Sequence, residues 1–287
     1  MATTIDAGFR LFRKNLEITD LQEATVSTRQ QGVRTAIEKE LVVLDSFLTG
    51  SYKRSTLIAP LAEADIDIFV VLDPGYYDAN GQAALLDRVK RVLKTTYPTT
   101  PSISRNGQAV TITFTEFKVD VVPGFYRNGG GFLIPDSQLN RWIATDPKKH
   151  VDVFSDANKA HNGDLVPLLK MLKAWNKSRD VLRSFHLDML ALTVLTGIRI
   201  DDFPSGVRYV FDKARAKIKV KLNDPAGYSD DVAAHVKTTA EMDEIINRLT
   251  FAYERAVEAE QLAAQGKIQD AFKKWAVIFK DYFPSYG

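Results

Sequence analysis

The chain has 287 residues, of which 45% are hydrophobic, and a formal net charge of +2. This length predicts one large domain or two lobes, and the near-neutral charge excludes a strong overall field that recruits nucleic acid or membranes. The absence of cysteine excludes disulfides, thiolate zinc sites and a cysteine nucleophile. No apolar run approaches the roughly 18 residues of a membrane span, and the first residues lack a signal-peptide pattern. We therefore expect a cytoplasmic protein.

The first predicted elements are two helices and a strand. Apolar residues recur at helical spacing over residues 5–17. Thr19 and Asp20 can cap a second helix, which runs to about Glu40. The apolar run over residues 41–48 then predicts a strand, which ends at Gly50-Ser51.

Two acids open the next predicted strand, Asp65–Leu72, which is otherwise apolar. In a strand, side chains at i and i+2 lie on the same face about 7 Å apart, so Asp65 and Asp67 share a face. Two carboxylates about 4 Å apart repel by roughly 4 kcal/mol at an effective dielectric constant of about 20, so such a pair needs a cation or a shared proton. Mg²⁺ is the cation that best suits carboxylate and phosphate oxygens, and Mn²⁺ is an alternative.

A third acid lies in a later predicted strand. Residues 110–114 alternate as one strand, and residues 118–123 form the next, with Asp120 in its middle. If this strand lies beside the strand of Asp65 and Asp67, the three carboxylates form one cluster. Such a cluster can hold two metal ions about 4 Å apart, an arrangement that activates an attacking oxygen and stabilises a leaving phosphate.

The spacing of these residues resembles a known signature. Gly50-Ser51, thirteen further residues, Asp65-Ile66-Asp67-Ile68 and later Val119-Asp120-Val121 are similar to the motif of the polymerase-β-type nucleotidyltransferases. The resemblance implies that Gly50 and Ser51 hold a nucleoside triphosphate. It also implies that Asp65, Asp67 and Asp120 are catalytic and bind two Mg²⁺ ions, and that Asp120 helps to deprotonate the attacking hydroxyl.

The remaining predicted elements divide the chain into two parts. A helix over 81–97 and three strands between 102 and 123 belong to the first part. The glycines at 129–131 predict a hairpin turn rather than a phosphate loop, because no helix follows them. After residue 146 the pattern predicts only helices, at 146–159, 165–178, 184–199, 205–217, 238–265 and 267–280. We therefore predict an α/β (α+β) fold, with a polymerase-β-like nucleotidyltransferase core containing a mixed sheet and N-terminal helices over 1–145, and a helical nucleotide-clamping domain over 146–287.

Two of the predicted helices add a second resemblance. Leu168–Asn176 and Ser184–Leu190 look like the corresponding helices of oligoadenylate synthases and cyclic GMP-AMP synthase. The resemblance implies that Lys173 and Ser184 bind the donor triphosphate and that Phe185 stacks on a base. Each residue also has a simpler interpretation: a solvated helix residue for Lys173, a helix cap for Ser184 and core packing for Phe185.

Further segments resemble the bacterial CD-NTases, the cyclic-oligonucleotide synthases of CBASS antiphage defence. These segments are Ile134–Ser137, Arg141–His150 and Trp275–Pro284. The resemblance implies that the chain makes a cyclic di- or trinucleotide second messenger from NTPs, releases pyrophosphate and signals to a separate effector protein. It also implies conjugation of Gly287 to a partner. The chain lacks a cysteine/histidine metal thumb, so we expect no activation by DNA, and we expect no membrane partner.

Two alternatives remain open from the sequence. The first is linear transfer of nucleotides to an RNA end or a protein, for which the basic segment 208–221 is the candidate acceptor surface. Salt-dependent RNA affinity would favour it. The second is a nucleotide-binding sensor that has lost catalysis, which the presence of all three aspartates disfavours.

Overall fold

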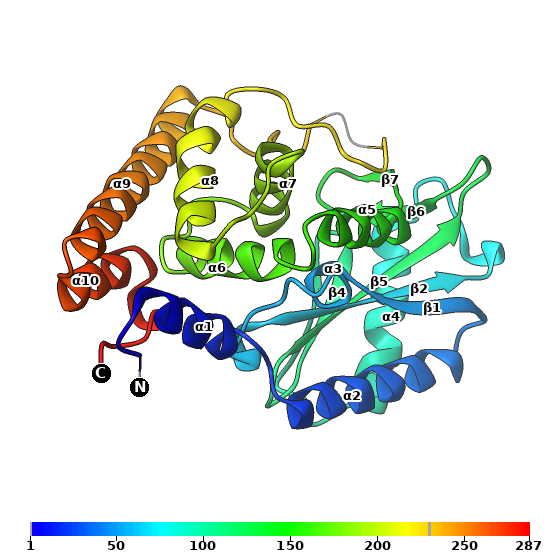
Figure 1. Cartoon of the computed structure of the whole chain (residues 1–287). Coiled ribbons are helices and arrows are strands. Elements are labelled where there is room, and N and C mark those ends of the chain that lie inside the picture. The colour runs from blue at the N-terminus through cyan, green and yellow to red at the C-terminus, as the bar shows by residue number, and fades with distance from the viewer. Residues whose placement is uncertain (1, 229–230) are drawn as a thin grey trace. The chain divides into compact units, whose positions relative to one another are not determined.

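The computed structural model describes residues 2–228 and 231–287. The chain forms two compact units, whose elements are labelled in Figure 1. The first, which we call the sheet unit, spans Ile18–Val153. The second, the helical unit, combines Met1–Glu17 with Phe154–Gly287, so it is built from both ends of the sequence.

The sheet unit contains a seven-stranded mixed sheet, which confirms the predicted sheet type. Five strands lie in the order β1-β2-β5-β4-β3, and β6 pairs with β5 and β7. Strands β2 and β5 run parallel, whereas the other pairs are antiparallel. The strands are β1 (Val43–Thr49), β2 (Asp65–Leu72), β3 (Ser102–Asn106), β4 (Ala109–Thr113), β5 (Lys118–Tyr126), β6 (Phe132–Asp136) and β7 (Arg141–Thr145).

The sheet unit also contains helices, several of which begin with recognisable caps. Helix α2 (Asp20–Glu38) starts with a capping box, in which Thr19 and Gln22 each accept a backbone N–H of the other. Helix α4 (Gln82–Thr96) follows β2, and the one-turn helix α3 (Gly50–Lys53) follows β1. Helix α5 (Pro147–Ala160) passes from the sheet unit into the helical unit. Short 3₁₀ turns lie at Leu61–Glu63 and Pro74–Tyr76, and a third, Lys280–Tyr282, lies in the helical unit.

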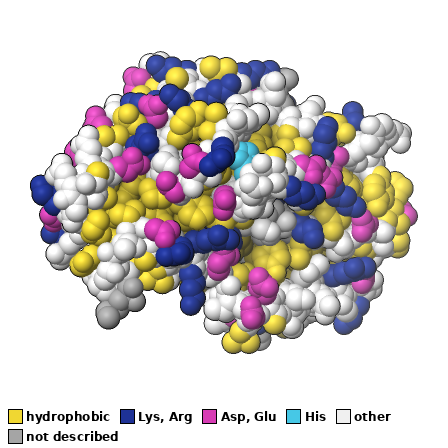
Figure 2. Space-filling model, in the orientation of Figure 1, with side chains coloured by type: hydrophobic (Ala, Val, Ile, Leu, Met, Phe, Trp, Pro, Cys, Tyr) yellow, Lys and Arg dark blue, Asp and Glu magenta, His cyan; other side chains and the backbone are white. Residues whose placement is uncertain are grey.

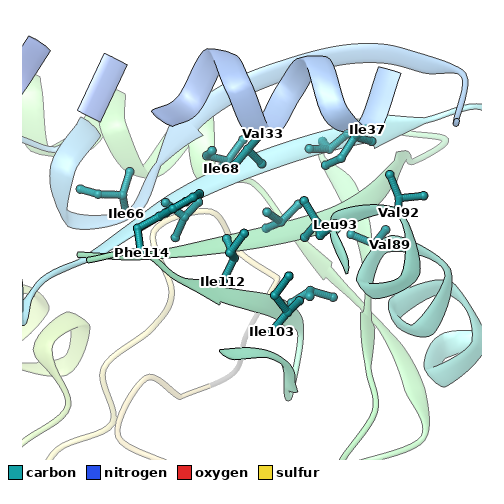
Figure 3. Close-up of a cluster of buried hydrophobic side chains, with 14 of the residues drawn as sticks. Val33, Ile37, Ile66, Ile68, Val89, Val92, Leu93, Ile103, Ile112 and Phe114 are labelled. Atoms are coloured by element: carbon teal, nitrogen blue, oxygen red, sulfur yellow. The ribbon is translucent and has the colours of Figure 1, made fainter. Parts of the chain in front are cut away.

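The main core of the sheet unit lies between one face of the sheet and helices α2 and α4 (Figure 3). Ile66 and Ile68 of β2 belong to this core, in which Val33 of α2 lies beside Ile68 and Val89 of α4 is a further member. Alternation along the strand places Asp65, Asp67, Phe69 and Val71 on the opposite face. Phe69 and Val71 form a second apolar cluster there with Phe132 and Ile134. The aspartates therefore begin the face of β2 that α2 and α4 do not cover.

The helical unit is held together by aromatic side chains from distant parts of the sequence. Its helices, apart from the end of α5, are α1 (Ile5–Asn15), α6 (Leu165–Lys177), α7 (Ser184–Leu195), α8 (Phe203–Lys217), α9 (Thr239–Ala264) and α10 (Ile268–Phe279). Phe9 of α1 meets Trp275 of α10 edge-on at a centroid distance of 4.9 Å. The ring centroids of Phe12 and Phe279 lie 4.6 Å apart. All four side chains are fully buried, so α1 is an integral part of the helical unit.

Most elements confirm the sequence-based expectations. The glycines at 129–131 have positive φ angles and join β5 to β6 as the predicted hairpin. Three features differ. Strand β7 was not predicted, and residues 1–17 group with the helical unit rather than with the expected 1–145 core. The boundary expected between residues 145 and 146 lies between Val153 and Phe154. Among the residues that the structure describes, no helix combines the length and apolar character needed to cross a membrane.

Candidate active site

The predicted catalytic acids come together through the pairing of four strands. In the parallel pair, Asp67 of β2 lies opposite Asp120 of β5. Thr49 of β1 pairs with Asp67, and Thr111 of β4 pairs with Asp120. Paired residues of neighbouring strands lie about 5 Å apart with side chains on the same face, so these four form one row across the sheet. Asp65 occupies the same face two residues before Asp67.

Gly50 lies directly against the Asp67 carboxylate. A Cβ atom added at Gly50 would lie 1.7 Å from Asp67 Oδ2, a distance at which two atoms overlap. The φ angle of Gly50 is also +64°, in the left-handed region that favours glycine. Only a residue without a side chain lets the chain turn from β1 into α3 this close to Asp67. Ser51, the next residue, lies partly exposed within α3.

The environment of Asp120 shows that negative charge accumulates in the row. Burial raises the pKa of the Asp120 carboxyl above its ordinary value, and the charge of Asp65 raises it further. Two groups lower the pKa: the Thr111 hydroxyl, which donates to Asp120 Oδ1, and the Lys118 ammonium. Three carboxylates on one face, with one nearby lysine, therefore form a site where a cation is favourable.

The type of ligand in this row suits a hard divalent cation. Such ions take oxygen ligands from one or two carboxylates together with substrate phosphates. As placed, no three acidic or histidine side chains in the described ranges 2–228 and 231–287 converge closely enough to enclose a metal ion. Asp67 lies against Gly50 and Asp120 accepts the Thr111 hydroxyl in this arrangement. The donor set and its excess negative charge fit the metal role, and the acids remain our predicted ligands.

The predicted triphosphate ligands Lys173 and Ser184 lie in the helical unit. Ser184 is the first residue of α7 and is exposed. Lys173 of α6 is 5% exposed, and its Nζ atom lies 3.0 Å from Oδ2 of Asp188 on α7. The simpler interpretation of Lys173 as a solvated helix residue is therefore wrong. Asp188 lies one helical turn after Ser184, on the same face of α7.

The two residues after Ser184 differ in their surroundings. Phe185 is partly exposed, and its ring centroid lies 6.4 Å from that of Phe154. This position is compatible with both base stacking and packing. His186 is 1% exposed, and its Nδ1 atom lies 3.0 Å from Nε2 of His235. Burial, helped by the neighbouring His235, lowers the pKa of His186 to about 4, as a packed neutral histidine requires.

Sequence reasoning missed two residues that contact the candidate groups. Thr111 hydrogen-bonds to Asp120, and alternation along residues 110–114 could have placed it on the same face as its strand partner. Asp188 pairs with Lys173, and its position as an acid inside an apolar helix was the available signal. Neither pairing could be assigned without the strand register or the packing of α6 on α7.

The basic segment 208–221 is less available than its sequence indicates. Arg208 forms an ion pair with Glu260 of α9. Lys213 and Arg215 both pair with Asp212. Figure 2 shows basic and acidic side chains interspersed on the face that it presents. Three of the six cations that suggested an acceptor surface for RNA therefore form ion pairs within the helical unit, with two carboxylates between them.

Comparison with known proteins gives the same assignment. Residues 3–158, over half of the chain, match the Second Messenger Oligonucleotide or Dinucleotide Synthetase (SMODS) domain. The cyclic AMP-AMP-AMP synthase of Acinetobacter sp. (strain ATCC 27244 / 9458) is 31% identical over 157 residues, which are 53% of this chain and 45% of that protein. The chain thus matches less than half the length of this relative. A probable cyclic nucleotide synthase of Bacillus cereus (strain VD146) is 24% identical over 272 residues, which are 83% of this chain and 81% of that protein.

The fold is also that of a solved synthase. The crystal structure of the Vibrio cholerae DncV cyclic AMP-GMP synthase superposes with a TM-score of 0.80 over 99% of this chain and 98% of that one, although only 15% of residues are identical. The matched region of the family contains Gly50, Asp65, Asp67 and Asp120. The chain therefore belongs to the Second Messenger Oligonucleotide or Dinucleotide Synthetase family, the bacterial cGAS/DncV-like CD-NTases.

Proposed function

We propose that this chain joins nucleoside triphosphates into a cyclic di- or trinucleotide and releases pyrophosphate. The observation that carries the proposal is the pairing of Asp67 with Asp120 on parallel strands, with Asp65 on the same face and Gly50 against Asp67. This is the arrangement expected of a site in which the ribose hydroxyl of one nucleotide attacks the α-phosphate of another. The family match supports the cyclic product.

Each predicted site residue of the sheet unit has a role in this proposal. Asp65, Asp67 and Asp120 would hold divalent cations, Mg²⁺ or Mn²⁺, which neutralise the triphosphate and lower the pKa of the attacking hydroxyl. Asp120 would also help to deprotonate the attacking hydroxyl, as the resemblance to the polymerase-β-type nucleotidyltransferases implies. Gly50 and Ser51 would bring backbone and hydroxyl groups against the triphosphate, because no side chain at Gly50 stands in the way.

The remaining predicted ligands of the nucleotide are residues of the helical unit. Ser184 places a hydroxyl in the first turn of α7, where backbone N–H groups also favour an anion. Lys173 would contribute an ammonium to the same triphosphate. Phe185, whose side chain is partly exposed, would stack on a base. These three roles rest on the resemblance to related synthases and on the position of Ser184.

The biological setting is part of the same proposal. A cyclic nucleotide made in antiphage (CBASS) defence acts through a separate effector protein that recognises the product. Conjugation to a partner through Gly287 is the second proposed interaction. Gly287 is exposed, although its backbone exchanges hydrogen bonds with Ala2. Such conjugation would therefore require this short pairing to open.

The test is product analysis with purified protein. The protein is incubated with all four NTPs and Mg²⁺ or Mn²⁺, treated with phosphatase and examined by mass spectrometry. We expect a phosphatase-resistant cyclic product that disappears in Asp65→Asn/Asp67→Asn. Asp87→Asn is the matched control, because Asp87 is an exposed acid of α4 that pairs with Arg105 outside the row.

The other outcomes identify the alternatives. Phosphatase-sensitive linear oligomers would favour transfer to an RNA end, and the RNA affinity of the protein would then be measured against salt. Nucleotide binding without pyrophosphate release, in every cation and nucleotide mixture, would favour the catalytically silent sensor. A cyclic product that persists in the double variant would exclude the aspartate row as the active site.

A further inference from the structure

The ion pair between Lys173 and Asp188 is unusual because both side chains are buried. The exposed fraction is 6% for the Lys173 side chain and zero for that of Asp188. The two residues come from different helices, α6 and α7, and their charged atoms lie 3.0 Å apart. Removing two such charges from water costs much of what their attraction returns, so a buried ion pair adds little net stability. Net stabilisation of the fold therefore does not by itself account for this buried ion pair.

The position of Asp188 on α7 connects this ion pair to the proposed triphosphate site. Asp188 follows Ser184 by four residues, so both lie on one face of the helix. Helical side chains also lean towards the N-terminus, which directs Asp188 towards the turn of Ser184. The Lys173 ammonium, held by Asp188, consequently lies on the Ser184 face of α7. The structure thus brings the two predicted triphosphate ligands to one side of this helix.

The chemistry of an ammonium allows it to serve two anions. The Lys173 Nζ atom, which lies 3.0 Å from Asp188 Oδ2, carries three N–H donors, and an ammonium can therefore contact more than one acceptor. A lysine buried without a carboxylate is driven towards its neutral form, which cannot attract phosphate. Asp188 counters that effect, because a neighbouring negative charge favours the protonated lysine.

We propose that Asp188 is a positioning residue, which keeps Lys173 charged and directed to the Ser184 face of α7, where it meets the nucleoside triphosphate. This inference rests on the proposed function, since it assigns the ion pair to the nucleotide of that reaction. Asp188 acts through Lys173 and does not touch the substrate. Its proposed role is therefore distinct from that of the predicted metal ligands Asp65, Asp67 and Asp120.

The experiment compares Asp188→Asn with the wild type in two readouts. The first is the thermal stabilisation by ATP in the presence of Mg²⁺, which reports binding without turnover. The second is the pH profile of kcat/KM between pH 6 and pH 10. We expect the variant to lose about tenfold in ATP affinity and in 1/KM, with a smaller change in kcat. We also expect the alkaline limb of its kcat/KM profile to shift to lower pH than in the wild type, because Lys173 loses its proton more easily without the Asp188 carboxylate.

Two controls separate positioning from folding. Glu17→Gln removes the carboxylate that pairs with Lys170, the other buried lysine of α6, and should leave both readouts unchanged. Lys173→Met/Asp188→Leu removes both charges and restores an apolar contact if Asp188→Asn folds poorly. This double variant should fold and still bind ATP weakly. Asp188→Glu should recover part of the affinity.

The opposite results would overturn the inference. Unchanged ATP affinity and an unchanged alkaline limb in a destabilised Asp188→Asn protein would show a purely structural ion pair. So would full ATP affinity in the double variant. If the wild type binds ATP but forms no product, the proposed function fails, while the binding readout still decides the role of Asp188. If the wild type binds none of ATP, GTP, CTP and UTP in this assay, both proposals fail together.

Discussion

Gly50 shows how strongly a single position is constrained in this site. Its φ angle is +64°, and an added Cβ would overlap the Asp67 carboxylate. We expect Gly50→Ala to reduce product formation at least about a hundredfold, because the new methyl group must displace either α3 or Asp67. The left-handed backbone alone costs about 1–2 kcal/mol in stability. Product formation and thermal denaturation of the variant measure the two effects.

Gly129→Ala is the matched control for this prediction. Gly129 has a φ angle of +88°, and a Cβ atom there would meet nothing within 4 Å. The control therefore carries a similar backbone cost without the overlap. We expect it to lose some stability and keep its activity. Equal activity in the two variants would contradict the importance of the Gly50 contact.

The sequence was most informative at the residues that break a local pattern. Asp65, Asp67 and Asp120 interrupt apolar strands, and the register of β2 and β5 confirms that these strands are neighbours. Thr111 fits its local strand pattern, whereas Asp188 stands out as an acid inside an apolar helix. Their contacts with Asp120 and Lys173 depend on which strand or helix lies alongside, which no single segment specifies.

At the level of elements, α7 is joined to the segment after α8 by a pair of histidines. His186 of α7 lies 3.0 Å from His235. The Nε2 atom of His186 is buried and, within the described residues, has no hydrogen-bond partner. A buried Nε2 lone pair without a partner costs less free energy than a buried Nε2–H without one. His186 is therefore best assigned as the tautomer whose Nδ1–H donates to His235. The contact therefore requires both histidines to be neutral.

This pair predicts a loss of stability in acid. The pKa of His186 is about 4 in the folded chain, against an ordinary value of 6.5. The unfolded chain binds more protons between these values, so the stabilisation is complete above pH 6.5 and is lost as the pH falls towards 4. A shift of this size corresponds to at most about 3 kcal/mol. Denaturant unfolding from pH 7 to pH 4 measures it.

Two variants test the assignment to His186. In His186→Gln, the fall in unfolding free energy over this pH interval should become smaller by that amount. His150→Gln, which changes a histidine of the sheet unit outside the pair, should keep the slope of the wild type. An identical pH slope in His186→Gln and the wild type would contradict the assignment.

Strand β7 illustrates why some elements escaped prediction. Residues Arg141–Thr145 have no clear alternation in burial, and their strand depends on pairing with β6. Trp142 is fixed by a further hydrogen bond from its Nε1 atom to the carbonyl of Asp78, which lies 64 residues earlier. By contrast, α4 carries a regular apolar stripe and was predicted from its own sequence. Local periodicity specifies an element only when its burial is regular.

At the scale of the whole molecule, the helical unit joins the first helix of the sequence to the last. The amphipathic pattern of α1 predicted a helix but could not identify its partners. Phe12 is fully buried and packs on Phe279 and Phe283. These contacts place residues 1–17 in the helical unit, where the sequence alone had assigned them to the nucleotidyltransferase core.

Phe12→Ala tests this division of the chain. Removing a buried phenylalanine costs about 3–5 kcal/mol, and here the loss should fall on the helical unit. Hydrogen exchange should accelerate in α1 and α10, while β2 and β5 keep their protection. Leu21→Ala in α2 is the control, because Leu21 is 78% exposed and its truncation should change neither unit. If β2 and β5 lost protection together with α10, the two units would unfold as one, and the boundary at residues 17 and 18 would have no energetic meaning.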